Sequence, residues 1–273
     1  MSKKSNLKYL WWHELPAPEL TKFAREVSDI AILPIGATEQ HGPHCPIGVD
    51  AFNAKGMAEL IAQKTDVMLL PWLWYGSHPY HHWGMPGTIP LSYDTHIALL
   101  VDIIKGASVA GFNKFIILSA HGQVSTTLVA VHKLGLEGLF TLSLHWYDFL
   151  RDNKDVLDDY MWHADEAETS VGLYLYPQYI DMSKAEKGGG EALIDKRFII
   201  APGQMPKPGM MYHFEGTFAR PEYKELPNGV IGDPTKATLE KGEIIVTRVV
   251  DHIVDLIEDI RTRWPVGTKP PVK

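Results

Sequence analysis

Cysteine, long apolar runs and an excess of positive charge are all missing from this chain. Its single cysteine, Cys45, cannot form an intramolecular disulfide, which fits a reducing compartment. No stretch reaches the ~18 apolar residues of a membrane-spanning helix. The amino-terminal MSKKSNLKYLWWHELPAPEL also lacks the continuous apolar segment of a signal peptide. We therefore expect a cytoplasmic protein without a membrane partner.

Positive charge is scarce throughout. The 273 residues include 26 Lys and Arg against 33 Asp and Glu, so the net charge is −7 and a nucleic acid is not expected as a partner. Repeats, low-complexity tracts and a recognisable linker are absent as well. Because 45% of the residues are hydrophobic, the chain can build a full core, and we predict a single domain spanning residues 1–273.

Short apolar runs alternate with segments of helical periodicity. Each run is apolar on both faces, which is typical of a mainly parallel sheet covered by helices on both sides. The sequence thus predicts an α/β fold, with long loops in the Gly-, Pro- and Lys-rich region 183–236. The expected strands are 29–36, 67–71, 114–120 and 139–147, and the expected helices are 50–64, 94–111, about 124–135 and TLEKGEIIVTRVVDHIVDLIEDIRTRW near the carboxyl terminus.

One short loop concentrates polar side chains. In LPIGATEQHGPHCPIGVD, residues 33–50, Glu39, His41, His44 and Asp50 lie among glycines and prolines that rule out a continuing helix or strand. Such a loop buries little apolar surface but can hold side chains in fixed directions. Carboxylate and imidazole groups are ligands that divalent metals prefer, so the loop indicates a metal site.

Other polar clusters also follow predicted strands. They are YGSHPYHHWGMPGT at 75–88, His121, and WHADEAETS at 162–170. Sites in open α/β sheets form outside the carboxyl ends of the strands, so we expect these clusters to meet at one edge. The histidines expected there are His41, His44, His78, His81, His82, His121 and His163.

Ordinary structural explanations exist for each residue taken alone. The metal hypothesis gains from their convergence at one edge rather than from any single position. The alternatives are a helix cap for Asp50, a hydrogen-bonded turn for His121, an aromatic surface patch for His78, His81 and His82, and solvated first-turn carboxylates for Glu166 and Glu168.

The motifs LPIGATEQHGPHCPIGVD, YG…HHWGMPGT, LSAHGQ, HADEAETS and NGVIGDPTKATLEKGE resemble the creatininase (creatinine amidohydrolase) family, in the family's order from about residue 30 to 245. The resemblance implies a metal-dependent hydrolase with a three-layer α/β/α sandwich, and a homo-oligomer, often a hexamer. It also implies site residues: Glu39 and His121 as ligands of one metal, His41 of a second, Asp50 as the bridging carboxylate, His163 in proton transfer, and Glu168 in the site region.

Residues near the substrate follow from the same resemblance, since His82 and Gly87 match an H-x-x-x-PGT segment beside it. Three positions depart from creatininase. Gln123 replaces a glutamate ligand, Tyr160 replaces an aspartate and Asp165 replaces a small residue. The expected substrate-binding residues are Tyr75, His82, Trp83, Gly122 and Gln123, and the expected replacement for the missing ligand is Glu168 or else Glu166, or the weaker amide of Gln123.

Oxygen and imidazole ligands without thiolate suit Zn²⁺, Mn²⁺ or Fe²⁺, one or two per chain. Such ions bring the pKa of water down toward neutrality for attack on a carbonyl, and His163 would protonate the leaving atom. The segment 71–87 offers three tryptophans, two tyrosines and three histidines, whose faces and polar groups suit a sugar-like ring.

The expected activity is therefore hydrolysis of a small cyclic substrate. Lack of the creatininase glutamate at Gln123 favours an oxidised inositol, of the 3-dehydro-scyllo-inosose type, cleaved at a C–C bond in carbohydrate metabolism. Creatinine or another cyclic amide is one alternative, and a metal-dependent lyase or isomerase is another. A non-catalytic binding protein is disfavoured because it would not need a proton donor at His163.

Overall fold

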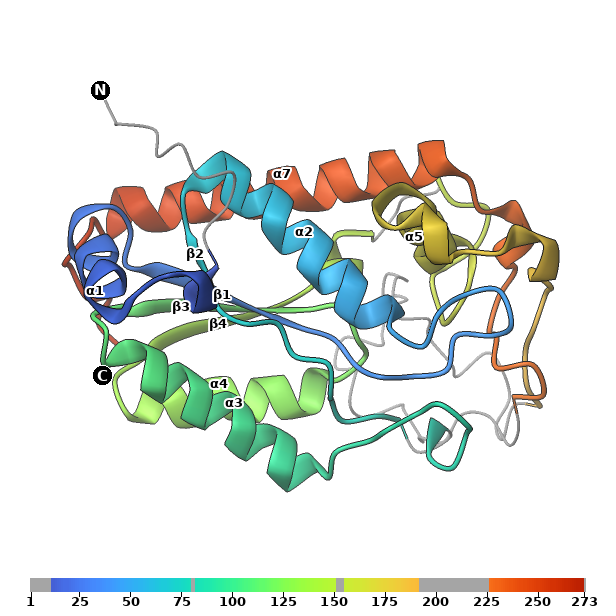
Figure 1. Ribbon diagram of the computed structural model, residues 1–273, viewed down its shortest axis with the longest axis horizontal. Coiled ribbons are helices and arrows are strands. Elements are labelled where there is room, and N and C mark those ends of the chain that lie inside the picture. Colours follow the sequence, from blue (N-terminus) through green and yellow to red (C-terminus); the bar gives the residue numbers. More distant parts are fainter. Residues whose placement is uncertain (1–10, 80–81, 151–154, 192–225, 273) are drawn as a thin grey trace, which may run out of the picture.

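The computed structural model describes residues 11–79, 82–150, 155–191 and 226–272 (Figure 1). His81, expected at the site edge, and residues 192–225 of the expected loop region lie outside this part of the chain. Among the described helices, none combines the length and the apolar character needed to cross a membrane.

A parallel sheet of four strands forms the centre of the molecule, in the order β2-β1-β3-β4. All the predicted strands are present, and each is somewhat shorter than expected. Every residue of β1 and β3 is buried, as central strands covered on both faces require. The strands are β1 (Ile30–Ile35), β2 (Met68–Leu69), β3 (Lys114–Ser119) and β4 (Phe140–His145).

Helices cover both faces of the sheet, which confirms the predicted three-layer α/β/α sandwich (Figure 1). Ile30 and Ile32 of β1 pack into the apolar cluster under α2, α5 and α7, whereas Leu33 and Ile35 pack into the cluster with α1, α3 and α4. The helices are α1 (Ala17–Glu26), α2 (Val49–Thr65), α3 (Tyr93–Ser108), α4 (Val124–Leu136), α5 (Glu166–Leu175) and α7 (Leu239–Arg263), with short 3₁₀ turns η1 (Trp12–Glu14), η3 (Trp146–Leu150), η4 (Pro177–Tyr179), η5 (Met182–Lys184) and η7 (Pro234–Lys236).

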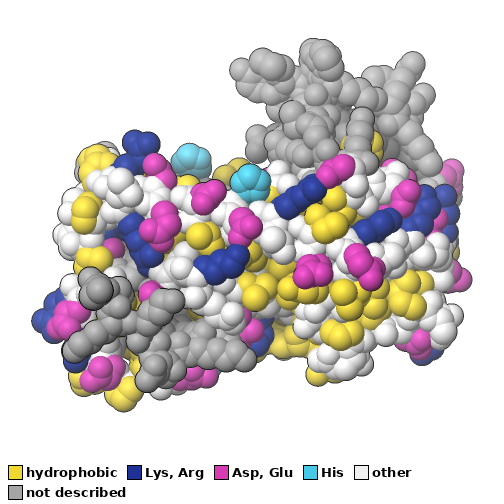
Figure 2. All heavy atoms as spheres, turned by 90° about the horizontal axis from the view of Figure 1, so that it is seen from above, with side chains coloured by type: hydrophobic (Ala, Val, Ile, Leu, Met, Phe, Trp, Pro, Cys, Tyr) yellow, Lys and Arg dark blue, Asp and Glu magenta, His cyan; other side chains and the backbone are white. Residues whose placement is uncertain are grey.

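The outer surface of the layer that holds α2 and α7 carries both charged and apolar side chains (Figure 2). Lysine and arginine side chains alternate there with aspartate and glutamate (Figure 2). Some of these charges pair, as when Lys64 of α2 lies 2.6 Å from Asp251 of α7. Exposed pairs of this kind contribute at most about 1 kcal/mol each, so the apolar clusters on the two sheet faces supply most of the stability.

Asp50 is not the cap of α2, contrary to the ordinary explanation for that residue. Gly48 occupies the cap position and makes no side-chain hydrogen bond, while Asp50 lies inside the first turn. Other helices do have side-chain caps: Ser92 accepts from Thr95 N in α3. The carboxylate of Asp50 is therefore free of a capping role and can face the carboxyl edge of the sheet.

Candidate metal centre

The loops that follow β1 and β3 meet at the carboxyl edge of the sheet, as the sequence predicts. Glu39 and His41 lie between β1 and α2, Asp50 opens α2, and His121 lies between β3 and α4. All four side chains are buried. Glu168 reaches the same place from the first turn of α5, so the cluster draws on several segments rather than on one loop.

Two sets of candidate ligand atoms share Asp50. In the first, His121 Nδ1 lies 3.2 Å from Glu39 Oε2 and 3.2 Å from Asp50 Oδ2. In the second, His41 Nε2 lies 3.5 Å from Asp50 Oδ1 and 3.4 Å from Glu168 Oε2. Asp50 thus directs one oxygen into each set, which is the arrangement of a carboxylate that bridges two ions.

Backbone carbonyls fix the tautomers of both histidines. His41 Nδ1 lies 3.0 Å from the Glu39 carbonyl oxygen, and His121 Nε2 lies 3.0 Å from that of Ser77. A carbonyl oxygen only accepts, so these nitrogens carry protons, and the opposite nitrogens, His41 Nε2 and His121 Nδ1, are the ones that a metal ion can use once the rings are neutral. Such outer contacts commonly orient histidine ligands of metals.

Unpartnered buried atoms support a metal here. His41 Nε2 and both oxygens of Asp50 make no hydrogen bond within the described part of the chain, although the two side chains are almost fully buried. Buried polar atoms without partners are costly and rare. Divalent ions would satisfy them. A donor set of carboxylate oxygens and imidazole nitrogens suits Zn²⁺, Mn²⁺ or Fe²⁺.

Without an ion, the histidines compensate the buried carboxylates. Burial alone would raise the pKa of Glu39, but the charges of His121, His82 and His163 outweigh it and hold that pKa well below its usual value. Burial alone would lower the pKa of His121, yet Glu39 and Asp50 raise it to about 10. The proton that His121 carries in this state would have to be released for a metal ion to bind its Nδ1.

His163 lies beside both sets of ligand atoms. Its Nδ1 is 3.7 Å from Glu39 Oε2, and its ring centre is 4.4 Å from that of His41. Its Nε2 lies 2.8 Å from the Gln40 carbonyl oxygen and 3.0 Å from the Gln40 side-chain nitrogen. The carbonyl is nearer and only accepts, so we assign the proton to Nε2. Burial, followed by the charges of His41 and His82, lowers the pKa of His163 well below its usual value, which keeps the ring neutral.

The backbone next to Gln40 holds that side chain in place. Gly229, in the NGVIGDP motif, has φ 70°, and a Cβ there would lie 1.7 Å from Gln40 Oε1. Only glycine fits this position, because both the left-handed backbone and the close approach exclude a side chain. Gly229 thus leaves the space that the Gln40 side chain occupies beside His163.

Glu166 is not at the centre, which corrects the expectation that it might replace the missing ligand. Its carboxylate accepts a hydrogen bond from Asp158 N at 3.0 Å and another from Lys241 Nζ. Glu168 Oε2, by contrast, accepts from Ala164 N at 2.6 Å and faces His41.

Asp165 caps α5, which explains one departure from the creatininase pattern. Its Oδ1 accepts from Ala167 N and Glu168 N at 2.9 and 3.1 Å, and its Oδ2 accepts from Trp162 N at 2.5 Å. The cap fixes the turn that carries Glu168. Nothing in the structure explains Tyr160.

The side chain of Gln123 forms hydrogen bonds with neighbouring protein groups and does not face the two sets of candidate ligand atoms. Its Nε2 donates to Gly36 O at 3.3 Å and to Ser119 Oγ at 3.2 Å, and its buried Oε1 has no hydrogen-bond partner within the described residues. His44, also expected in the polar cluster, pairs with Thr169 Oγ1 at 2.9 Å. This hydrogen bond ties the loop that follows β1 to α5.

The expected substrate-binding residues divide into two groups. His82 is buried with its Nδ1 2.7 Å from Glu39 Oε1, whereas Tyr75 and Trp83 are each 48% exposed and Gly122 is exposed. Trp72 and Trp74, counted with this segment in the sequence, pack instead against Trp11 and Phe52, with ring centres 5.0 and 5.3 Å apart. Fewer aromatic faces are thus available to a ligand than the sequence suggested.

Comparisons with known proteins agree with this geometry. The creatininase family (creatinine amidohydrolase) matches residues 13–257. A 3-dehydro-scyllo-inosose hydrolase of Thermotoga maritima is 34% identical over 90% of this chain and 82% of its own length. The creatinine amidohydrolase of Pseudomonas putida is 25% identical over 84% of this chain and 89% of its own. A crystal structure of creatininase, 23% identical, aligns with a TM-score of 0.74 over 95% of this chain and 99% of that one.

Proposed function

Because the chain belongs to the creatininase family and is a hydrolase that is not creatininase itself, we propose that it opens a small cyclic substrate by attack of water on a carbonyl. The proposed centre holds two divalent ions, with Asp50 as the shared ligand. The observation that carries the proposal is the divergence of the two Asp50 oxygens, 3.2 Å from His121 Nδ1 and 3.5 Å from His41 Nε2. The proposed ligands are Glu39, His41, Asp50, His121 and Glu168.

Bound divalent ions would activate the water and polarise the carbonyl. The chain itself supplies the proton transfer. With its proton on Nε2 and bonded to Gln40 O, His163 has a free Nδ1 lone pair directed toward Glu39. It takes the proton that the attacking water releases and delivers it to the leaving atom.

The favoured substrate is a cyclic polyhydroxylated ketone of the oxidised-inositol class. The relative from Thermotoga maritima that is 34% identical carries the name of such a hydrolase, and Gln123 lacks the carboxylate of creatininase. Tyr75 and Trp83, each 48% exposed, offer ring faces to a sugar-like ring at the edge of the site. Creatinine or another cyclic amide is the second candidate, supported by the amidohydrolase that is 25% identical.

The metal, the assembly and the domain organisation belong to the same proposal. Zn²⁺, Mn²⁺ and Fe²⁺ all suit the donor set, and elemental analysis after gentle purification distinguishes them. We propose one catalytic domain in a homo-oligomer such as a hexamer, which light scattering tests, and a cytoplasmic enzyme.

A side-by-side assay of the metal-loaded protein tests the activity. Oxidised inositols, creatinine, simple lactams and short peptides are offered at equal concentration in ¹⁸O-labelled water. We expect turnover of the inositol ketones with one labelled oxygen in the product. Turnover of creatinine alone would reject the ketone preference, and a product without label would show a lyase or isomerase. Absence of bound metal would reject the centre itself.

A further inference from the structure

His78 is a buried histidine that the family resemblance leaves without a role. It is 1% exposed, and neither of its ring nitrogens has a hydrogen-bond partner within the described residues. Leaving two imidazole nitrogens buried and unsatisfied costs about 1–3 kcal/mol for each group. A side chain kept at that cost needs a partner beyond those that the described residues supply.

The position of His78 identifies the partner as the metal centre. One of its nitrogens, one carboxylate oxygen of Glu39 and one nitrogen of His121 all lie within 4.8 Å of one another. The rings of His78 and His121 are 4.7 Å apart between centres. The three donors therefore surround one point on the Glu39 side of the cluster.

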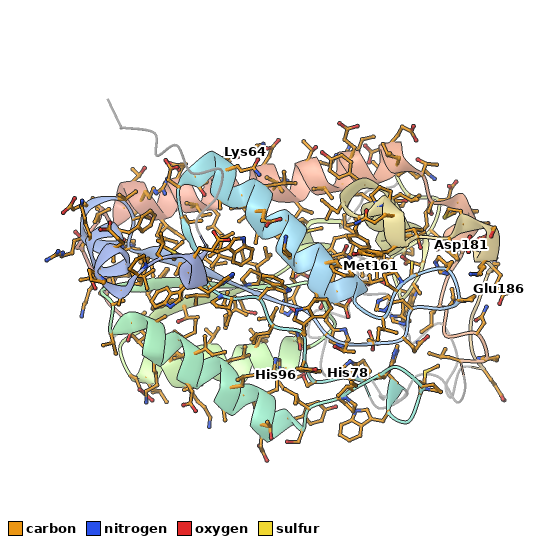
Figure 3. The ribbon with its side chains drawn as sticks, in the orientation of Figure 1. Lys64, His78, His96, Met161, Asp181 and Glu186 are labelled. Carbon is orange, nitrogen blue, oxygen red and sulfur yellow. The ribbon has the colours of Figure 1, made fainter. Side chains whose placement is uncertain are left out.

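The backbone of His78 is anchored on both sides. Trp83 Nε1 and Tyr93 Oη donate to its carbonyl oxygen at 3.2 and 3.1 Å. The preceding carbonyl, of Ser77, accepts from His121 Nε2 at 3.0 Å. Anchoring of this kind holds a ligand in a fixed direction and links it to the neighbouring ligand. In Figure 3, His78 lies next to the first turn of α3, near His96.

The segment that carries His78 lies against the position of the missing ligand. A Cβ at Gly76 would fall 2.3 Å from Gln123 Oε1, so the chain passes directly over the amide that replaces the glutamate of creatininase. The nitrogen of that amide is engaged with Gly36 O and Ser119 Oγ. The loop that carries His78 therefore packs against a side chain that is itself held in place.

We propose that His78 is an additional nitrogen ligand on the Glu39 and His121 side of the metal centre, beside the shared carboxylate of Asp50. The inference rests on the proposed metal centre and deepens it. Imidazole suits Zn²⁺ and Fe²⁺ better than Mn²⁺, which prefers carboxylate. His78 therefore biases this position toward the borderline-soft ions.

The test compares His78→Phe with His96→Phe. Both replacements remove a buried imidazole and keep a ring, but His96 belongs to α3, outside the ligand groups, and binds Thr126 Oγ1 at 2.9 Å. Metal-free wild type and both variants are titrated with Co²⁺, Zn²⁺ and Mn²⁺ while equivalents bound and the visible absorption of Co²⁺ are recorded. Unfolding of each metal-free protein is measured first, and His78→Asn replaces any His78→Phe protein that does not fold.

In the His78 variant we expect one of two equivalents to bind Zn²⁺ at least ~10-fold more weakly, a smaller loss for Mn²⁺, and an altered Co²⁺ spectrum. His96→Phe should keep wild-type affinities and spectrum. Unchanged binding in the His78 variant, or an equal loss in His96→Phe, would overturn the assignment while leaving the proposed function intact. A wild-type protein that binds no metal would overturn both.

Discussion

Glu166 and Glu168 offer a matched pair of variants within one helical turn. Both side chains are buried in the first turn of α5, at 3% relative exposure. Glu168 Oε2 faces His41 Nε2 at 3.4 Å, while Glu166 pairs with Lys241 and the backbone of Asp158. The substitutions Glu168→Gln and Glu166→Gln change each carboxylate to an amide of the same shape. They should therefore have opposite effects on metal binding and on stability.

For Glu168→Gln we expect metal affinity at the His41 side to fall by ~100-fold, because loss of a contact that only supports a ligand already costs ~10- to 100-fold. At saturating metal a 100-fold weaker Kd removes about 2.7 kcal/mol of linked stabilisation. The metal-free protein should change little, since burial raises the pKa of Glu168 and a neutral amide avoids that cost. Thermal unfolding should thus show a smaller rise of Tm on adding metal.

For Glu166→Gln the expectation is reversed. Weakening the bond to Lys241, whose side chain is 23% exposed, should cost about 1–2 kcal/mol in the metal-free and metal-loaded protein alike. That corresponds to about 2–4 °C in Tm per kcal/mol, with metal content unchanged by elemental analysis. Retention of both metal equivalents by Glu168→Gln, together with loss of one in Glu166→Gln, would refute the assignment of α5.

Further variants test the shared ligand, the proton donor, the protonation of the cluster and the missing carboxylate. Asp50→Ala should strip both metal equivalents and His41→Ala mainly one, as measured by elemental analysis. His163→Asn should keep its metal and lose ~10²-fold or more in turnover; loss of metal would instead make it a ligand. The pKa of His121 is raised from 6.5 to about 10 in the metal-free protein, so its contribution to folding is complete below about pH 6.5 and lost as the pH rises toward 10. Urea unfolding should show the metal-free protein weakening over that range while metal affinity, which requires proton release, increases. Gln123→Glu should raise metal affinity, most of all for Mn²⁺, in a competition titration.

The sheet and the location of the site follow from the sequence because both rest on local patterns. Runs such as IAILPI and KFIILS are apolar at positions on both faces, which identifies central parallel strands. The rule that parallel strands end at one edge then brings Glu39 and His121 together without any knowledge of long-range contacts. The side chains of the loop after β1 and of the first turns of α2 and α5 then have only to face this edge of the sheet.

The direction of individual side chains could not be predicted. Glu166 and Glu168 are two residues apart at a helix start, and the difference between them is set by Lys241, which lies 75 positions further along the chain. The direction of the His78 ring could not be predicted either, because HPYHHW has neither helical nor strand periodicity. Trp74 turns toward Phe52 because Gly48 leaves room for its ring. Each outcome depends on tertiary contacts between distant segments.

The charge of the centre connects these residues with the reaction. Glu39, Asp50 and Glu168 supply the carboxylates of the two sets of donor atoms. Gln123 has an amide where creatininase has a further carboxylate. With two divalent ions bound, three carboxylates would leave the centre with excess positive charge, whereas a glutamate at 123 would neutralise it. Breaking a C–C bond beside a ketone places negative charge on the departing fragment, and preorganised positive charge stabilises it most in a buried site. A neutral amide at 123 therefore suits the proposed ketone substrate better than a carboxylate would.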